Sequence, residues 1–120
     1  MKAPRTVTVP TVDHGLLTLT CPAWCAEHDT RIPQYKTDLS HRGAEHTFRF
    51  EGEELFRAML TKYPFGSGSR ETGLYIEEGG FARTLDPAGL RQLAATLTVH
   101  AVHLRTLAGQ LDAILRGGDQ

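Results

Sequence analysis

The sequence predicts an α+β domain, in which an antiparallel sheet of about four or five strands carries a Cys/His knuckle and one long C-terminal α-helix. Three observations support this class: alternating β-branched and apolar residues early in the chain, a Cys- and His-rich segment at residues 21–28, and a helical pattern after Pro87. The 120 residues suffice for one domain with a modest core. We expect a single domain over residues 1–116 and a disordered tail over residues 117–120.

The first strands are predicted by two alternating runs, TVTVPTV at residues 6–12 and LLTLT at residues 16–20, with the turn signal DHG between them. Such a pattern is typical of a β-hairpin. Pro10 restricts the first strand to a sheet edge or a bulge, because proline has no backbone N–H to donate. The polar stretch from Arg31 to Ala44 contains several turn-forming residues and predicts a loop.

Residues 54–63 are compatible with either a helix or a strand. Phe48 and Phe50 alternate with polar residues, which predicts a strand over Thr47–Glu51. The apolar residues that follow have helical spacing: Leu55, Phe56, Met59, Leu60 and Tyr63. A strand would instead turn Phe56, Ala58 and Leu60 to one side. Local propensity favours a helix, whereas the family resemblance described below favours a strand, and we adopt the strand.

A second hairpin is predicted by GLYIEEGGFARTL at residues 73–85. Gly79 and Gly80 can both adopt the positive φ that a tight two-residue turn requires. The alternating residues on either side of this pair then predict two paired strands.

The C-terminal helix has signals at both ends. Asp86 is a suitable N-cap, Pro87 suits the first helical turn, and the pair Gly117-Gly118 ends the pattern. Between them, apolar positions recur at spacings of three and four, as in a helix seam: Leu90, Leu93, Leu97, His100, Leu104, Leu107, Leu111 and Ile114.

This helix is long for so small a domain. Thirty residues span about 45 Å, whereas a domain of this size has a radius of gyration near 13–14 Å. We therefore expect the helix to overhang the sheet, and its C-terminal half, from Leu104 on, to need a partner. A second copy of the chain is the simplest partner, so we expect a homodimer formed through one helix face: Leu90, Leu97, Leu104 and Leu111.

The segment CPAWCAEHD suggests a metal site. Zinc prefers four sulfur or nitrogen ligands in a tetrahedron, supplied by short turns of chain. Cys21, Cys25, His28 and His41 give the spacing C-x3-C-x2-H-x12-H. His46 is an alternative ligand, because Cys21, Cys25, His41 and His46 resemble a zinc-finger set. Fifteen residues separate Cys25 from His41, however, where a finger has about twelve. Two buried structural cysteines, or a redox dithiol, are the other interpretations.

Four protein ligands fill the coordination sphere of zinc and leave no position for substrate, which favours a structural metal over a catalytic one. An enzyme would need three of these ligands, with Glu27 or Glu45 as a base. The sequence contains no H-E-x-x-H motif and no phosphate-binding glycine loop. We therefore do not expect an enzyme. Trp24 is expected to shield the metal, and Asp29 or Asp38 to orient a ligand histidine.

The overall charge argues against a nucleic-acid-binding surface. Thirteen basic and fourteen acidic residues give a net charge of -1, whereas phosphate binding requires clustered basic residues. Basic residues near the knuckle alternate with acidic ones: Arg31, Lys36, Arg42 and Arg49. The sequence has neither a membrane-spanning apolar stretch nor the apolar core of a signal peptide. A cytoplasmic protein that does not bind membranes is therefore expected.

Three segments carry a family resemblance: LTCPAWCAEHD, LSHRG and LDPAGLRQLAATLTVHAVHL. They resemble a small actinobacterial domain of unknown function that occurs in streptomycetes and on their mobile elements and phages. The resemblance spans roughly residues 17–105 and implies zinc binding and a strand over Leu55–Thr61, without an established activity. It carries over these motif residues: Cys21, Pro22, Trp24, Cys25, His28 and His41.

Together these features indicate a non-catalytic interaction or regulatory module that contains a structural zinc ion, is dimeric through its helix and binds a protein partner that the sequence does not identify. A DNA-binding transcriptional regulator is the alternative, and a zinc hydrolase is a third hypothesis.

Overall fold

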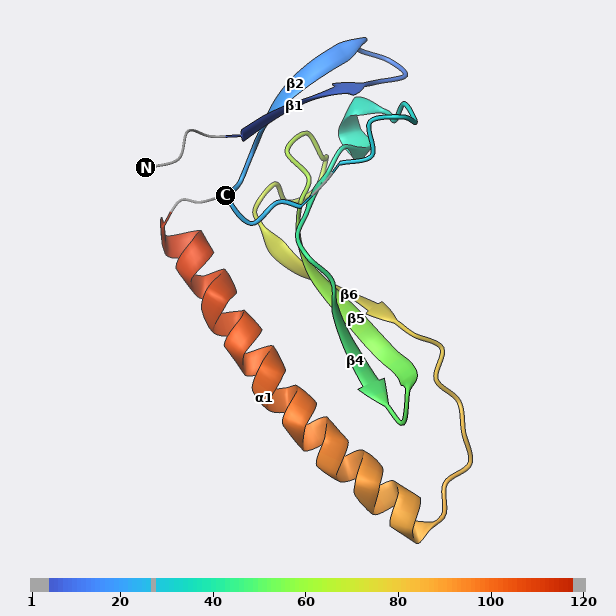
Figure 1. The fold of residues 1–120 in the computed structure, drawn as a ribbon. Helices are drawn as coiled ribbons and strands as arrows, with labels where there is room; N and C mark the ends of the chain where they lie inside the picture. Colours follow the sequence, from blue (N-terminus) through green and yellow to red (C-terminus); the bar gives the residue numbers. More distant parts are fainter. Residues whose placement is uncertain (1–4, 27, 118–120) are drawn as a thin grey trace.

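The computed structural model describes residues 5–26 and 28–117, and it confirms the α+β class with antiparallel strands and one long C-terminal helix (Figure 1). The elements follow in this order: β1 (Arg5–Pro10), β2 (Leu16–Cys21), the 3₁₀ turn η1 (Lys36–Asp38), β3 (His41–Arg42), β4 (His46–Phe50), β5 (Glu53–Lys62), β6 (Gly73–Glu78) and α1 (Pro87–Gly117). The strands form two sheets rather than one. Of the predicted tail, Gly117 belongs to α1 and residues 118–120 lie outside the described residues.

The predicted N-terminal hairpin is confirmed as a separate two-stranded sheet. β1 and β2 pair antiparallel from Arg5 opposite Cys21 to Pro10 opposite Leu16. Pro10 is the last residue of β1, where a missing N–H interrupts the ladder least. The hairpin buries Val9 and Leu19 against Leu39, which forms the first small hydrophobic core.

β5 is the central strand of the second sheet, and it pairs antiparallel with β3, β4 and β6. The strand interpretation of residues 54–63 is thereby confirmed over Glu53–Lys62. Glu51 and Gly52, with φ of 48° and 82°, form the two-residue turn between β4 and β5. Such a turn matches the twist of the paired strands, so β4 and β5 form a tight hairpin.

The predicted second hairpin is wrong, because no strand follows Gly80 before the helix. Gly79 donates its N–H to the Leu55 carbonyl, and a Cβ there would lie 2.5 Å from the Glu54 carbonyl oxygen. The chain then crosses the β4–β5 turn, where Phe81 packs edge-on against Phe50 at 5.9 Å and Arg83 forms ion pairs with two acidic residues: Glu51 and Glu53. These tertiary contacts replace the strand pairing that local alternation predicts.

Helix α1 begins as predicted. The Asp86 carboxylate accepts a hydrogen bond from the Gly89 N–H at 2.7 Å, so Asp86 is the N-cap. Leu107 is 4% exposed and packs with Phe48 and Ala58 in the second hydrophobic core. Leu104 also packs against that core, and the expectation that the helix needs a partner stays a prediction.

The large exposed apolar residues of α1 lie nearer its start: Leu90, Leu97, Val99 and Val102. Figure 1 shows the helix running along the second sheet and extending past its strands, as its length predicts. The molecule is correspondingly elongated, with extents of 56 × 31 × 25 Å and a radius of gyration of 17.7 Å. Within the described part of the chain, no helix combines the length and apolar character that a membrane span requires.

Candidate metal centre

Four side chains from separate points of the fold converge where the hairpin meets the second sheet. Cys21 is the last residue of β2, and His41 is the first residue of β3. Cys25 lies in a turn in which its N–H donates to the Pro22 carbonyl at 3.0 Å. His28 lies in the loop that follows this turn. One potential ligand atom from each residue lies within 4.8 Å of the other three. These are the four residues that the sequence predicts.

The backbone around the cysteines is tied to the second sheet. The Ala26 N–H donates to the Arg42 carbonyl at 2.8 Å, and the Gly43 N–H donates to the Leu60 carbonyl at 2.8 Å. A Cβ at Gly43 would come within 3.3 Å of the Trp24 carbonyl oxygen, so only glycine allows this approach without displacement. The turn that carries the cysteines is therefore fixed against β3 and β5.

The distances between the candidate ligands fit a tetrahedral metal ion. Sulfur at 2.3 Å and nitrogen at about 2.05 Å from zinc imply a sulfur–nitrogen separation of about 3.5 Å at the tetrahedral angle. The His28 Nε2 lies 3.4 Å from the Cys21 Sγ and 3.2 Å from the Cys25 Sγ. The His41 Nδ1 lies 3.5 Å from the Cys25 Sγ. The donor set and its spacing thus suit a metal such as zinc.

The electrostatics of the centre also favour a bound cation. Burial raises the pKa of the Cys25 thiol, and the neighbouring Cys21 raises it further. Burial lowers the pKa of His28 and, with the nearby His28 and Lys62, that of His41 to about 4. The imidazoles are therefore neutral and have lone pairs to donate. A divalent cation that displaces the thiol protons supplies the positive charge that buried thiolates require.

Arg5 is a supporting residue that the sequence analysis missed. Its guanidinium donates to the Cys25 carbonyl at 2.7 Å and to the Ala26 carbonyl at 2.8 Å. The hydrogen bond with Cys21 raises the pKa of Arg5. The register of the first hairpin could have revealed it, because Arg5 is the residue opposite Cys21.

Other predicted residues lie apart from the centre. The His46 ring contacts His103 at 5.3 Å and is not part of the four-residue cluster. Asp29 pairs with Arg31 at 3.1 Å. Asp38 lies in η1. Neither aspartate belongs to the four-residue cluster.

Of the two carboxylates considered as catalytic bases, one belongs to the described part of the chain. Glu45 is held by the Arg57 guanidinium at 2.9 Å. Glu27 lies outside the described residues.

The basic residues near the knuckle are engaged within the protein. Arg31 pairs with Asp29, Lys36 lies 4.7 Å from the centroid of the Phe65 ring, and Arg49 donates to the Gly52 carbonyl. They lie in different segments: Arg31 in a loop, Lys36 in η1 and Arg49 in β4. Nucleic-acid binding thus gains no support from their arrangement.

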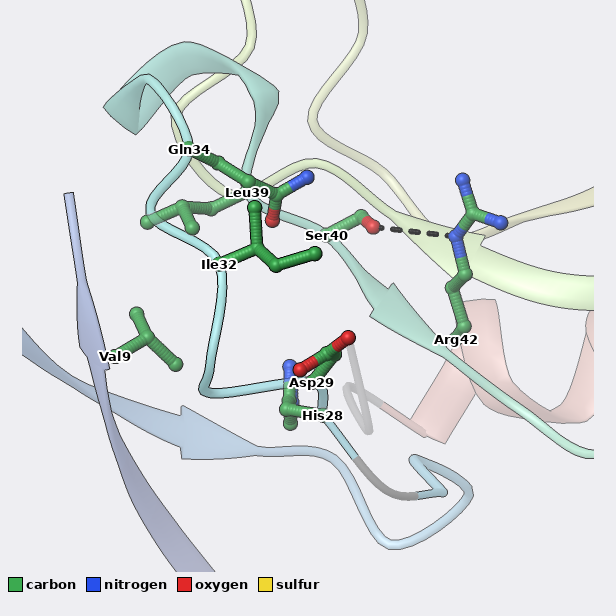
Figure 2. Close-up of a pocket in the computed structure, with 8 residues that line it drawn as sticks. All are labelled: Val9, His28, Asp29, Ile32, Gln34, Leu39, Ser40 and Arg42. Atoms are coloured by element: carbon green, nitrogen blue, oxygen red, sulfur yellow. Dashed lines mark hydrogen bonds between the residues drawn. The ribbon is translucent and has the colours of Figure 1, made fainter. Parts of the chain in front are cut away.

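A cavity of about 270 Å³ lies directly beside the centre, with His28 in its wall. Figure 2 shows it between Val9 of β1 on one side and Ser40 and Arg42 on the other. The Arg42 Nε donates to the Ser40 hydroxyl oxygen at 3.4 Å. The metal centre is therefore reached from the surface on its His28 side.

The comparisons with known proteins give one match. The model of the DUF6907 family, described as a domain of unknown function, matches residues 6–113. No curated protein and no solved structure matches the chain.

Proposed function

The chain belongs to the DUF6907 family, whose function is unknown, and we propose from its own site that it is a non-catalytic interaction module stabilised by one structural zinc ion. The observation that carries this proposal is the convergence of four sulfur and nitrogen donors to within 4.8 Å of one another. Two thiolates and two neutral imidazoles form a neutral complex with a divalent cation, and zinc is the common metal for such sets. The actinobacterial and mobile-element origin that the resemblance implies stays a prediction.

A structural role is supported by what the ligands connect. Cys21 belongs to the hairpin sheet and His41 to the second sheet, so one ion joins both. Each hydrophobic core is small, with three buried residues among those described. A structural zinc ion contributes folding free energy that cores of this size supply only in part.

Elemental analysis of freshly reduced, purified protein tests the proposal. We expect about one zinc ion per chain, and loss of zinc in Cys25→Ser because its sulfur lies against both histidines. His46→Ala is the matched control and should keep its zinc, because His46 lies outside the cluster. A chain without zinc, or zinc loss in the control alone, contradicts the proposed centre.

Self-association is the second part of the proposal. Leu90 and Leu97 are 55% and 44% exposed, whereas Leu104 packs against the core of its own chain. Only one charged residue, Arg91, lies on α1 before Leu104. We therefore place the contact between two copies on the N-terminal half of the helix rather than along the whole predicted face of Leu90, Leu97, Leu104 and Leu111.

Light scattering at high protein concentration measures this contact. We expect twice the mass of one chain, and the mass of one chain for Leu97→Glu, because a charge at the contact must lose its water. Thr98→Glu, which changes the neighbouring exposed residue, should leave the mass doubled. A single-chain mass for the unmodified protein would contradict self-association.

A further inference from the structure

The four candidate ligands are not equally fixed, and His28 is the least fixed. Cys21, Cys25 and His41 are only 6%, 6% and 3% exposed, whereas His28 is half-buried. Three surface cavities border on His28, and none of them is lined by the other three ligands. Solvent and small molecules therefore approach the centre at His28.

The backbone on either side of His28 explains this difference. Cys21 and His41 lie in strands, and Cys25 lies in a hydrogen-bonded turn. Among the described residues after Ala26, the next backbone hydrogen bond to another part of the chain is made by the Gln34 carbonyl, which accepts from Val12 at 2.9 Å. Within residues 28–33, the described backbone makes no such bond.

A ligand on a loosely attached segment has a lower effective concentration at the metal than one held by a strand. Cys21, Cys25 and His41 are therefore the three more firmly held ligands, and His28 is the ligand that is displaced at the lowest cost. Three fixed protein ligands with one exchangeable position are the arrangement that lets a metal bind an external molecule.

The surroundings of the exchangeable position favour an anionic ligand. Arg5 lies against the carbonyls of Cys25 and Ala26, and Arg42 lines the cavity beside His28. Asp29 also lines this cavity, but its charge is balanced by Arg31. Val9 and Leu39, each 3% exposed, supply an apolar wall (Figure 2). A small organic anion with a soft donor atom fits these features.

We propose that a small thiol carrying a carboxylate replaces His28 at the metal and occupies the cavity beside it. The inference rests on the proposed zinc site. The thiol sulfur takes the place of the His28 Nε2 at the metal, the thiol proton passes to solvent, and the carboxylate pairs with the Arg42 guanidinium. The cavity volume of about 270 Å³ limits the ligand to roughly the size of an amino acid.

Cobalt substitution of the full chain tests the inference, because thiolate-to-cobalt absorption reports each sulfur on the metal. Titration with 3-mercaptopropionate should add a saturable band while cobalt stays bound. With 2-mercaptoethanol, which lacks the carboxylate, saturation should need about tenfold more thiol. Arg42→Gln should abolish this preference, whereas Arg91→Gln, an exposed arginine on α1, should keep it.

The His28→Ala variant provides a second measurement. Removal of the competing imidazole should lower the thiol concentration needed for saturation by about tenfold, because the open state no longer has to be formed first. Should this variant fail to fold, the titrations of the unmodified chain and of Arg42→Gln decide the question alone.

The outcomes separate this inference from the zinc proposal. Absence of cobalt binding refutes both. If cobalt binds but neither thiol changes its spectrum, the centre is closed to external ligands. This result overturns the inference and leaves the zinc proposal intact. A spectrum that responds to pH but not to thiol means that water takes the position, which also overturns the inference. The inference is also overturned if ultrafiltration after the titration finds the cobalt free in the filtrate. The thiol would then have removed the metal rather than replaced His28.

Discussion

At the scale of single residues, burial shifts the pKa values of the candidate ligands. His41 is 3% exposed, and burial, the nearby His28 and the cationic Lys62 together lower its pKa to about 4. At neutral pH its ring is therefore uncharged, and in the tautomer with the proton on Nε2 the Nδ1 lone pair is available to a metal. Cys25 is the opposite case, because burial raises its pKa and metal binding must displace the thiol proton.

The shifted pKa of His41 predicts how the metal-free protein responds to acid. In the unfolded chain His41 titrates near its ordinary pKa of 6.5, and in the folded chain at about 4. Since the folded state disfavours the proton, stability is unaffected above pH 6.5 and falls as the pH drops from 6.5 to about 4. The loss amounts to roughly 3 kcal/mol at most.

Urea unfolding of chelator-treated protein at pH 7 and pH 4.5 measures this loss. The His41→Gln variant cannot titrate at this position, so its stability should change less between the two pH values. An equal loss in the variant and in the unmodified protein would mean that other groups cause the acid sensitivity.

At the scale of elements, α1 is attached to the sheet through a short stretch. Leu107 packs with Phe48 and Ala58, and the His100 ring nitrogen lies 2.8 Å from the Arg49 carbonyl oxygen. The Phe48 ring also contacts the rings of His100 and His103 at 5.2 and 4.8 Å. The attachment therefore centres on Phe48, near the middle of the helix.

Truncation of Leu107 should weaken this attachment. Leu107→Ala removes a 4% exposed side chain from the second core and leaves a cavity, so we expect a loss of about 2–5 kcal/mol in the free energy of unfolding. Leu97→Ala makes the same chemical change at a 44% exposed position and should lose less than about 1 kcal/mol. Chemical denaturation of both variants, at concentrations where the chain is monomeric, compares them; equal losses would contradict the packing described.

The elements also show where sequence reasoning succeeds. The cap of α1 and the first hairpin are set by neighbouring residues, so local patterns predict them. β5 is harder, because its apolar residues fit two periodicities and only pairing with β3, β4 and β6 makes it a strand. The prediction of a hairpin around Gly80 is wrong for the same reason, because tertiary contacts decide the structure there. Contacts of Phe81 and Arg83 with distant residues outweigh a favourable local turn.

The site follows the same rule. Cys21, Cys25 and His28 lie within eight residues, so their spacing alone brings them together, and His41 is predicted by the need for a fourth ligand. The role of Arg5 and the cavity lined by Arg42 depend on strand register and on the path of the loop between Ala26 and Gln34. Strand register and loop path are features of the tertiary structure, and the spacing of residues along the sequence does not predict them.

At the scale of the whole molecule, the two sheets depend on one shared junction. β1 and β2 pair only with each other among the described strands, and their core joins them to Leu39 rather than to the helix. The candidate metal centre links the end of β2 to β3. A metal ion held by these four residues would therefore be a cross-link between a small hairpin unit and a larger unit that contains α1.

Removal of the metal should consequently loosen the two units unequally. In the chelator-treated protein, the backbone amides of β1 and β2 should exchange with solvent about tenfold or more faster, because the hairpin then loses the ligand Cys21 as an attachment. It keeps the core of Val9, Leu19 and Leu39, the Arg5 contacts, and the hydrogen bonds of the loop after β1 with Gln34 and Lys36. Amides of β5 near Ala58 and of α1 near Leu107 should change little, since their core contains no ligand. Hydrogen exchange followed by mass spectrometry resolves the two regions, and restoring zinc should restore protection. Uniform acceleration in every element would show that the metal supports one cooperative unit, and unchanged exchange in the hairpin would show that the centre does not join the sheets.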